Sequence, residues 1–196
     1  MLINIMIRKI KCFFKKAFSN TFYYAVRYRM FGSNLFVGVR SRVTGKGFMK
    51  LGENVTVHSD CFIATFPKNK GLIIGNNVMI GQFSRIGCKN SVIIEDNVFT
   101  GPNVFIADYN HNYSNINIPI LEQDDVVYTK GVVIRRDTWI GTNVSIIGNV
   151  NIGKHCVIGA NSVVTHNIPD YSVAVGCPAR VIKRYDFNQN KWVKVR

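Results

Sequence analysis

His111 is the residue of this sequence whose type and surroundings best suit proton transfer. It lies in a polar segment, after Tyr109 and Asn110 and before Tyr113. An imidazole changes its protonation near neutral pH and can serve as a general base. Asp108, three residues earlier, or a backbone carbonyl would orient the ring. Because tyrosine and asparagine hydrogen-bond hydroxyl-rich ligands, the segment predicts a base that acts on a hydroxyl compound.

The other histidines and the cysteines do not form a metal-binding pattern. His58, His155 and His166 fall in or near turns, and we expect His58 and His155 to be surface residues. The cysteines lack the CxxC spacing typical of zinc sites. They are Cys12, Cys61, Cys88, Cys156 and Cys177. Their odd number and scattered places predict free thiols in a reducing compartment and no bound metal.

Aliphatic residues recur every six positions along most of the chain. The recurring positions are Ile74, Ile80, Ile86, Ile94, Thr100, Ile106, Ile134, Ile140, Ile146, Ile152, Ile158 and Val164. Glycine usually follows, and we expect Gly or Asn to adopt the left-handed backbone conformation of tight turns. Alternation alone would also suit antiparallel strands, but a sustained period of six favours a parallel β-helix whose coils bury one another's apolar residues.

The repeat has a regular coil length, one longer coil and one interruption. Three sixes make a coil of about 18 residues, as from Ile134 to Ile152. The step from Ile74 to Ile94 is longer, which predicts a small bulge near Cys88–Asn90. The period stops after Ile106 and resumes near Val132, so residues of about 107–133 form an inserted loop that carries His111. Insertions in repeat proteins often build the binding face.

The ends of the chain are basic. The formal net charge is +14, and residues 1–52 contain no Asp or Glu. Such a field attracts anions. Residues 1–48 are predicted as a basic amphipathic helix and lead-in, 49–170 as the β-helix, and 171–196 as a basic tail. The helix would either cap the solenoid or lie on an anionic membrane; it is too charged to span one and does not resemble a signal peptide.

Three stretches of the sequence resemble a known family. They are Asp137-Thr138-Trp139-Ile140-Gly141, Ile158-Gly159-Ala160-Asn161-Ser162-Val163-Val164-Thr165 and Gly176-Cys177-Pro178-Ala179-Arg180-Val181-Ile182-Lys183. With the hexapeptide period, they are similar to the hexapeptide-repeat O-acetyltransferases, and most of all to the bacterial capsule and lipopolysaccharide enzymes. The resemblance covers residues of about 50–185. It implies an all-β fold, a left-handed parallel β-helix, and acetyl-CoA as co-substrate without a metal.

The resemblance also implies roles for individual residues. His111 would be the general base for an acceptor hydroxyl that attacks the thioester directly, with no acyl-enzyme. A backbone N–H at Gly141 or Thr142 would stabilise the oxyanion, and Trp139 would lie beside the acceptor. The remaining residues would bind the donor: Ala160 and Thr165 along the pantetheine arm, and Arg180 and Lys183 at the nucleotide phosphates.

The predicted partners are acetyl-CoA, a glycan acceptor and two further copies of the chain in a homotrimer. The basic N-terminal segment and the C-terminal tail favour a sugar hydroxyl of a surface polysaccharide or its precursor, in the cytoplasm and peripherally at the inner membrane. Alternatives are acetylation of a xenobiotic or a free sugar, N-acetylation of a nucleotide-linked amino sugar, and a non-enzymatic β-helix that binds polyanions. Nucleic acid is not expected, because no recognition module is present.

Overall fold

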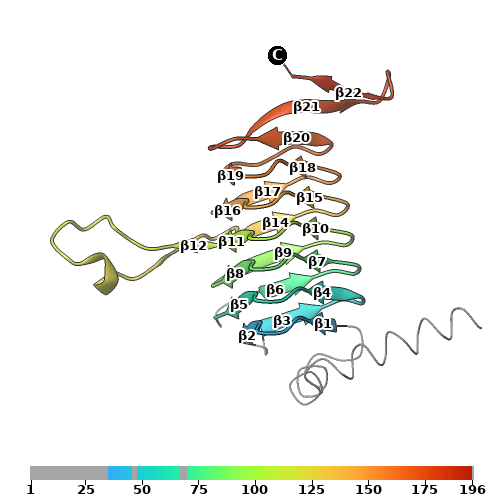
Figure 1. Cartoon of the computed structure of the whole chain (residues 1–196). Coiled ribbons are helices and arrows are strands. Elements are labelled where there is room, and N and C mark those ends of the chain that lie inside the picture. The colour runs from blue at the N-terminus through green and yellow to red at the C-terminus, as the bar shows by residue number, and fades with distance from the viewer. Residues whose placement is uncertain (1–34, 46–47, 67–69, 196) are drawn as a thin grey trace, which may run out of the picture.

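The chain forms a left-handed parallel β-helix of about seven coils, as the sequence predicted (Figure 1). The computed structural model describes residues 35–45, 48–66 and 70–195. The predicted N-terminal helix lies outside the described residues. Most coils contribute one short strand to each of three sheets, which we call A, B and C.

Every sheet contains strands from successive coils. Sheet A consists of β1 (Leu35–Val37), β4 (Val55–Val57), β7 (Met79–Ile80), β10 (Phe99–Thr100), β15 (Trp139–Ile140), β18 (Val157–Ile158) and β20 (Ser172–Val175), and continues into β21 (Arg180–Asp186) and β22 (Lys191–Lys194). Sheet B consists of β2 (Arg42–Thr44), β5 (Phe62–Thr65), β8 (Arg85–Cys88), β11 (Phe105–Ala107), β16 (Ser145–Ile147) and β19 (Val163–Val164). Sheet C consists of β3 (Met49–Leu51), β6 (Gly71–Ile74), β9 (Ser91–Ile94), β14 (Val132–Ile134) and β17 (Val150–Ile152).

The core contains the aliphatic residues that open each six, together with residues four positions later such as Val78 and Val98. Ile86, Ile106 and Ile146 occupy one register across β8, β11 and β16, and each is about 1% exposed or less. Their stiff β-branched side chains suit short strands. The same column is repeated in the other two sheets, so the core is one continuous apolar cylinder. The inward orientation predicted for these positions is confirmed.

The left-handed turn conformation predicted for Gly or Asn is confirmed for asparagine but not for the glycines of the repeat. The glycines that follow the aliphatic positions do not adopt positive φ; they permit close stacking, since a Cβ on Gly81 would lie 2.2 Å from the carbonyl oxygen of Gly101. Asparagines take the left-handed conformation instead. Asn103, Asn143 and Asn161 have φ of 56°, 60° and 60°, and their amides hydrogen-bond from coil to coil at 2.6 and 2.7 Å. An asparagine tolerates this conformation better than other side chains do.

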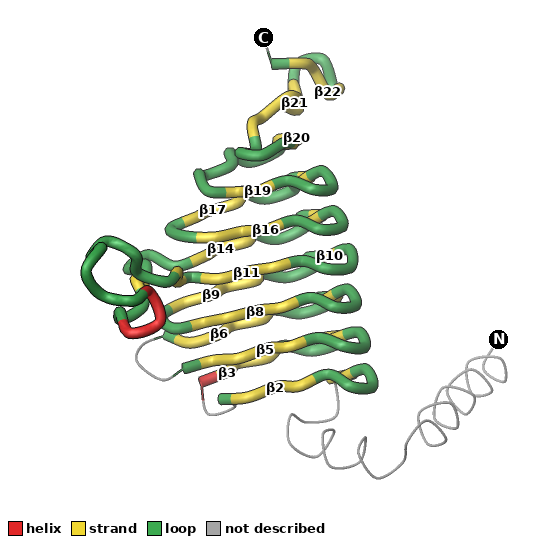
Figure 2. Tube along the Cα trace, turned by 60° about the vertical axis from the view of Figure 1, so that its left-hand side comes forward, coloured by secondary structure: helices red, strands yellow, loops and turns green. Residues whose placement is uncertain are grey.

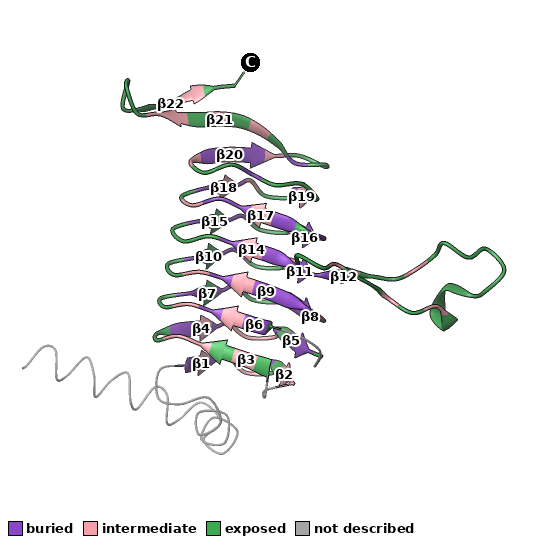
Figure 3. Cartoon of the chain, turned by 180° about the vertical axis from the view of Figure 1, so that it is seen from behind, coloured by how far each residue is buried: buried purple, intermediate pink, exposed green. Residues whose placement is uncertain are grey.

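The insertion projects from the corner between sheets B and C (Figure 2). The chain leaves the coil after β11 and rejoins it at β14. A short antiparallel pair, β12 (Tyr109–Asn110) and β13 (Val126–Val127), forms the stem. A 3-10 helix, η2 (Ile120–Glu122), lies in the outer part of the loop. Most of the loop is exposed, in contrast to the buried strands of the coils (Figure 3).

Both ends of the β-helix extend beyond the predicted segments. The strands β1 and β2 pair in parallel with β4 and β5, so coils begin within the segment 1–48 that was predicted as helix and lead-in. At the other end, β20 continues sheet A, and β21 and β22 turn back on it as an antiparallel hairpin. The basic tail is therefore ordered as an extension of a sheet.

Candidate functional site

Asp108 anchors the corner from which the loop departs. Its side chain is fully buried, and its carboxylate accepts hydrogen bonds from the backbone N–H groups of Lys89, Asn90 and Ser91 at 2.7, 2.7 and 2.5 Å. These donors belong to the turn that adds two residues to the coil, near the predicted bulge. The expectation that Asp108 orients His111 is wrong, because every described partner of its carboxylate lies at Cys88–Ser91, and the ring of His111 pairs with Asp125. A carboxylate that bridges three N–H groups stabilises the turn instead.

The partner of His111 is Asp125, on the opposite arm of the loop. The Nδ1 atom of the ring lies 2.8 Å from Oδ1 of Asp125, and Lys89 pairs with the other carboxylate oxygen. The hydrogen bond from Lys89, followed by the one from His111, lowers the pKa of Asp125. An ionised carboxylate only accepts hydrogen bonds, so Nδ1 is the donor of this pair, and in the neutral ring Nε2 holds the lone pair. The imidazole side chain is 75% exposed, so this lone pair is accessible to an acceptor.

Lys89 connects the loop to the coil. Its ammonium lies 4.9 Å from the ring centroid of Tyr109 and 5.4 Å from that of Phe66, while its backbone N–H bonds to Asp108. Cation–π contacts of this kind hold the ammonium in place beside Asp125. Neither Lys89 nor Asp125 was assigned a role from the sequence. The acidic residues near the end of the loop were a signal, but only the hairpin shows which carboxylate meets the ring.

The other loop residues predicted to bind an acceptor differ in their exposure and in their contacts. Tyr109 packs at the stem, where a Cβ on Gly87 would lie 2.8 Å from its ring. The side chain of Asn110 accepts a hydrogen bond from the backbone N–H of His111 at 3.0 Å, so it shapes the loop beside the base. Tyr113 is 72% exposed and available for a ligand.

Trp139 lies on the outer surface of sheet A. Its side chain is half-exposed and stacks on Phe99 of the preceding coil, with ring centroids 6.5 Å apart and an interplanar angle of 18°. Met79 is next to Phe99 in the same register. Trp139 therefore belongs to an outward apolar column that lies on a different side of the prism from the loop.

Three residues predicted to bind acetyl-CoA line the corner between sheets A and B: Gly141, Thr142 and Ala160. Gly141 is buried and its N–H donates to the carbonyl of Ile158 at 2.8 Å. The N–H groups of Thr142 and Ala160 are on exposed residues of successive coils, and neither has a hydrogen bond within the described part of the chain. Of the two predicted oxyanion donors, only the one of Thr142 is therefore free to meet a ligand.

The other residues predicted to bind acetyl-CoA lie nearer the C-terminal end of the chain. Thr165 is exposed, and its hydroxyl is 2.9 Å from Nδ1 of His166. Arg180 begins β21 and is exposed. Lys183 pairs across β21 and β22 with Lys194. Like charges directly opposite in a sheet repel, so this pair favours a bound anion.

One chain does not bring all these residues to one place. The loop with His111 leaves the corner between sheets B and C, whereas Thr142 and Ala160 lie at the corner between A and B. A parallel β-helix keeps its corners apart along its whole length. A site that uses both sets of residues therefore needs a second copy of the chain.

Metal and membrane features are few in the described residues. Across 35–45, 48–66 and 70–195, no group of three or more His, Cys, Asp or Glu side chains is arranged to hold a metal ion. Four cysteines are free thiols in this part of the chain: Cys61, Cys88, Cys156 and Cys177. Within the same ranges, no helix has the length and apolar character needed to cross a bilayer.

Comparison with known proteins agrees with this architecture. The family model of the bacterial transferase hexapeptide, which comprises six repeats, matches residues 131–166. A probable acetyltransferase of Mycobacterium tuberculosis is 45% identical over 76 residues, which cover 39% of this chain and 25% of that protein. The putative lipopolysaccharide biosynthesis O-acetyl transferase WbbJ of Escherichia coli is 36% identical over 94 residues, 44% of this chain and 47% of that protein. The matches thus span between a quarter and about half of these curated relatives.

Solved structures share the fold over a larger part of the chain. AntD, an N-acyltransferase from Bacillus cereus crystallised with dTDP-4-amino-4,6-dideoxyglucose and coenzyme A, superimposes with a TM-score of 0.68, covering 84% of this chain and 90% of that one at 21% identity. A maltose O-acetyltransferase from Clostridium difficile has a TM-score of 0.55 and 26% identity, covering 91% and 84%. The chain is thus a left-handed β-helix with the transferase hexapeptide repeat, and the resemblance predicted from its sequence is confirmed.

Proposed function

We propose that this protein is an acetyl-CoA-dependent O-acetyltransferase that modifies a sugar hydroxyl of a surface polysaccharide or its precursor. The observation that carries the proposal is the His111–Asp125 pair, at 2.8 Å, on a polar loop that projects from a hexapeptide β-helix. The similarity of part of the chain to a putative lipopolysaccharide O-acetyl transferase supports the acceptor class.

The pair performs one proton transfer. Nε2 of His111 removes the proton from the acceptor hydroxyl as its oxygen attacks the thioester carbonyl. The C–O bond forms, the C–S bond breaks, and the sulfur of coenzyme A takes up the proton from the imidazolium. Asp125 stabilises the imidazolium while it exists, because its carboxylate is ionised and hydrogen-bonded to Nδ1.

The corner between sheets A and B suits the donor. The free N–H groups of Thr142 and Ala160 present hydrogen-bond donors one coil apart, spaced for the amide carbonyls of a pantetheine arm. The N–H of Thr142 is also the candidate donor to the oxyanion. Arg180 and Lys183 lie further along the coil stack, where their charges would meet the nucleotide phosphates.

A homotrimer would complete the site. The loop carries large apolar side chains that the described residues leave uncovered, among them Ile116 at 92% exposed and Leu121 at 96%. Exposed apolar groups of this size indicate a contact surface. A loop that rests on the β-helix of a neighbouring subunit would bring His111 close to Thr142 of that subunit. Threefold closure satisfies the same contact in every copy.

The decisive experiment supplies the purified protein with labelled acetyl-CoA and a panel of acceptors. Oligosaccharides of surface polysaccharides are expected to be acetylated, and His111→Ala should lower kcat by about 10²- to 10⁴-fold. Transfer only to a small xenobiotic, to a free sugar or to the amine of a nucleotide-linked sugar would replace this acceptor class by the alternative. A near-normal rate for His111→Ala would refute the mechanism.

Cellular fractionation tests where the reaction takes place. We expect the protein on the cytoplasmic side, in peripheral contact with the inner membrane through its basic N-terminal segment, where lipid-linked precursors are present. High salt should release it from membranes, since the contact is electrostatic. Equal distribution between membrane and supernatant at low salt would count against that location.

A further inference from the structure

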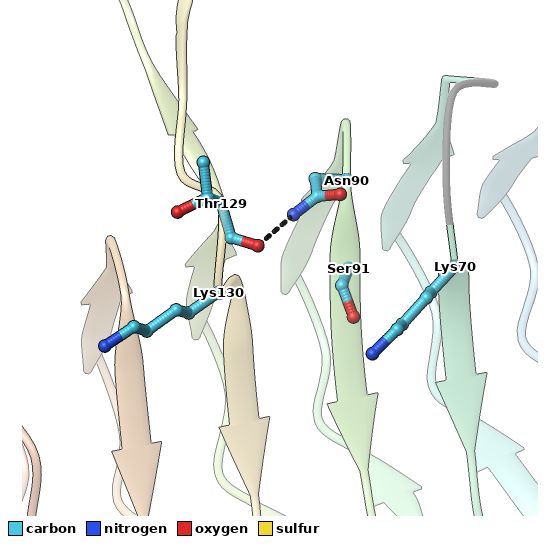
Figure 4. A pocket seen from close by; sticks show the side chains of 5 residues that line it. All are labelled: Lys70, Asn90, Ser91, Thr129 and Lys130. Atoms are coloured by element: carbon cyan, nitrogen blue, oxygen red, sulfur yellow. Dashed lines mark hydrogen bonds between the residues drawn. The ribbon is translucent and has the colours of Figure 1, made fainter.

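A cavity of about 590 Å³ lies beside the stem of the loop and has no part in the acetyl transfer described above. It is lined by Lys70, Asn90, Ser91, Thr129 and Lys130. Figure 4 shows that its wall crosses three neighbouring coils at the beginning of their sheet C strands. Lys70 precedes β6, Ser91 opens β9, and Lys130 lies two residues before β14.

Among the described residues, the lining of the cavity is cationic and carries no carboxylate. Lys70 and Lys130 are exposed, and neither ammonium has an ion pair or a hydrogen bond within the described part of the chain. In Figure 4 the ammonium of Lys70 extends toward the side chain of Ser91, whereas the side chain of Lys130 extends away from Ser91, toward the next coil. Two unpaired ammonium groups beside one cavity create a positive potential that favours an anion.

Ser91 supplies a second, independent indication of a ligand. The residue is 5% exposed, yet its hydroxyl has no hydrogen-bond partner within the described residues. Buried polar groups are nearly always satisfied, and this one lines the cavity beside Lys70. An oxygen of a bound anion would accept a hydrogen bond from the hydroxyl of Ser91 and would also contact the ammonium of Lys70.

Asn90 makes this wall rigid and joins it to the loop. Its amide donates to the carbonyl oxygens of both Tyr128 and Thr129, each at 2.9 Å. The backbone N–H groups of Asn90 and Ser91 are held by the buried Asp108. The cavity is therefore preformed at the base of the arm that carries Asp125, and binding there needs little reorganisation.

We propose that this cavity binds an acidic group of the acceptor glycan, a carboxylate or a phosphate. The proposal rests on the proposed function and narrows its substrate class to an anionic polymer. Lys130 lies five residues after Asp125, so the two are separated by at most about 17 Å of extended chain. One oligosaccharide can therefore reach both places, with its acidic group in the cavity and a hydroxyl at His111.

Calorimetric titration of the full chain tests the proposal. The probes are three oligosaccharides of equal length: one with uronic acid units, one linked by phosphodiesters, and one neutral. We expect Lys70→Ala/Lys130→Ala to raise the Kd of an acidic probe at least about tenfold, and Ser91→Ala to raise it less. The neutral probe should change by less than about twofold. Whichever acidic probe loses more affinity identifies the source of the anion.

A matched control and a second readout separate the possible failures. Lys50→Ala removes an exposed lysine of β3 in the same sheet but outside the cavity, and should leave all affinities unchanged. Equal losses for acidic and neutral probes, unchanged affinity in both cavity variants, or no binding of either acidic probe at low salt would overturn the anion site. Lysine-dependent binding without acetyl transfer would instead overturn the proposed function and leave the anion site intact.

Discussion

At the scale of the residue, the two oxygens of Asp125 have different partners. One accepts from His111 and the other pairs with Lys89. The side chain is 17% exposed, so water competes little for either contact. Lys89 keeps the carboxylate ionised, and the carboxylate fixes the ring with its lone pair toward solvent. A loop histidine thereby acquires the orientation that proton transfer needs.

Replacing Asp125 with Asn should lower kcat without altering the KM for acetyl-CoA. The amide can donate as well as accept, so it no longer specifies which ring nitrogen carries the proton. We expect a loss of about tenfold to a hundredfold, less than for His111→Ala. Steady-state kinetics measure it, with Asp124→Asn as the control because that neighbouring carboxylate is exposed. Equal rates for the two variants would contradict the pairing.

Cys88 predicts how stability depends on pH. Burial, reinforced by the carboxylate of Asp108, raises the pKa of this thiol to about 12, whereas an unfolded cysteine has a pKa of about 8.5. The folded protein thus keeps a proton that the unfolded chain releases. The contribution is complete below about pH 8.5 and is lost as the pH rises toward the folded value.

The free energy of unfolding should therefore fall between pH 8 and pH 10, and less steeply in Cys88→Ala. Urea titrations at the two pH values measure both slopes. Cys177→Ala serves as the control, since that thiol is exposed. Parallel slopes for the wild type and Cys88→Ala would show that Cys88 does not contribute to the loss.

At the scale of the element, the coil tolerates no side chain where two backbones meet. A Cβ on Gly81 would lie 2.2 Å from the carbonyl oxygen of Gly101, in backbone that cannot move without opening the coil. Gly81→Ala should lower the free energy of unfolding by about 1–3 kcal/mol or more, measured by urea denaturation. Gln82→Ala, at the exposed next position, should change it little. Comparable losses in the two variants would contradict close packing as the cause.

The period of six predicted these elements because each six has one inward position and one tight turn. It predicted the inward residues correctly, and the extra residues near Cys88–Asn90 form a turn there. It predicted positive φ for Gly or Asn in the turns, which is confirmed for the asparagines and wrong for the Ile-Gly glycines. Close approach and positive φ both favour glycine, and a sequence does not distinguish the two causes.

At the scale of the whole molecule, the candidate site is divided between two corners of one prism. His111 is on the loop, and Thr142 and Ala160 are on a different edge. No rotation of side chains joins them within one chain. Activity should therefore depend on assembly, and the exposed apolar residues of the loop are the surface to change.

Leu121→Asp should weaken the trimer and reduce acetyl transfer at low protein concentration, because a charge would have to be desolvated in the contact. Light scattering should give three times 22.2 kDa for the wild type and a smaller mass for the variant. Thermal unfolding of the coil should not change, since the side chain is 96% exposed. Glu122→Ala is the control. A fully active variant of unchanged mass would contradict a loop-mediated trimer.

The sequence by itself determined the β-helix, the place of the loop and the prominence of His111, because a period of six and its interruption are local properties of the chain. The tertiary structure decided the partner of His111, the burial of Asp108 and the cavity at Lys70, Ser91 and Lys130. These depend on which residues of neighbouring coils, about twenty positions apart, are stacked in register, and on how the loop folds back on itself. Neither the stacking register of the coils nor the folding of the loop can be read from the spacing of residues in the sequence.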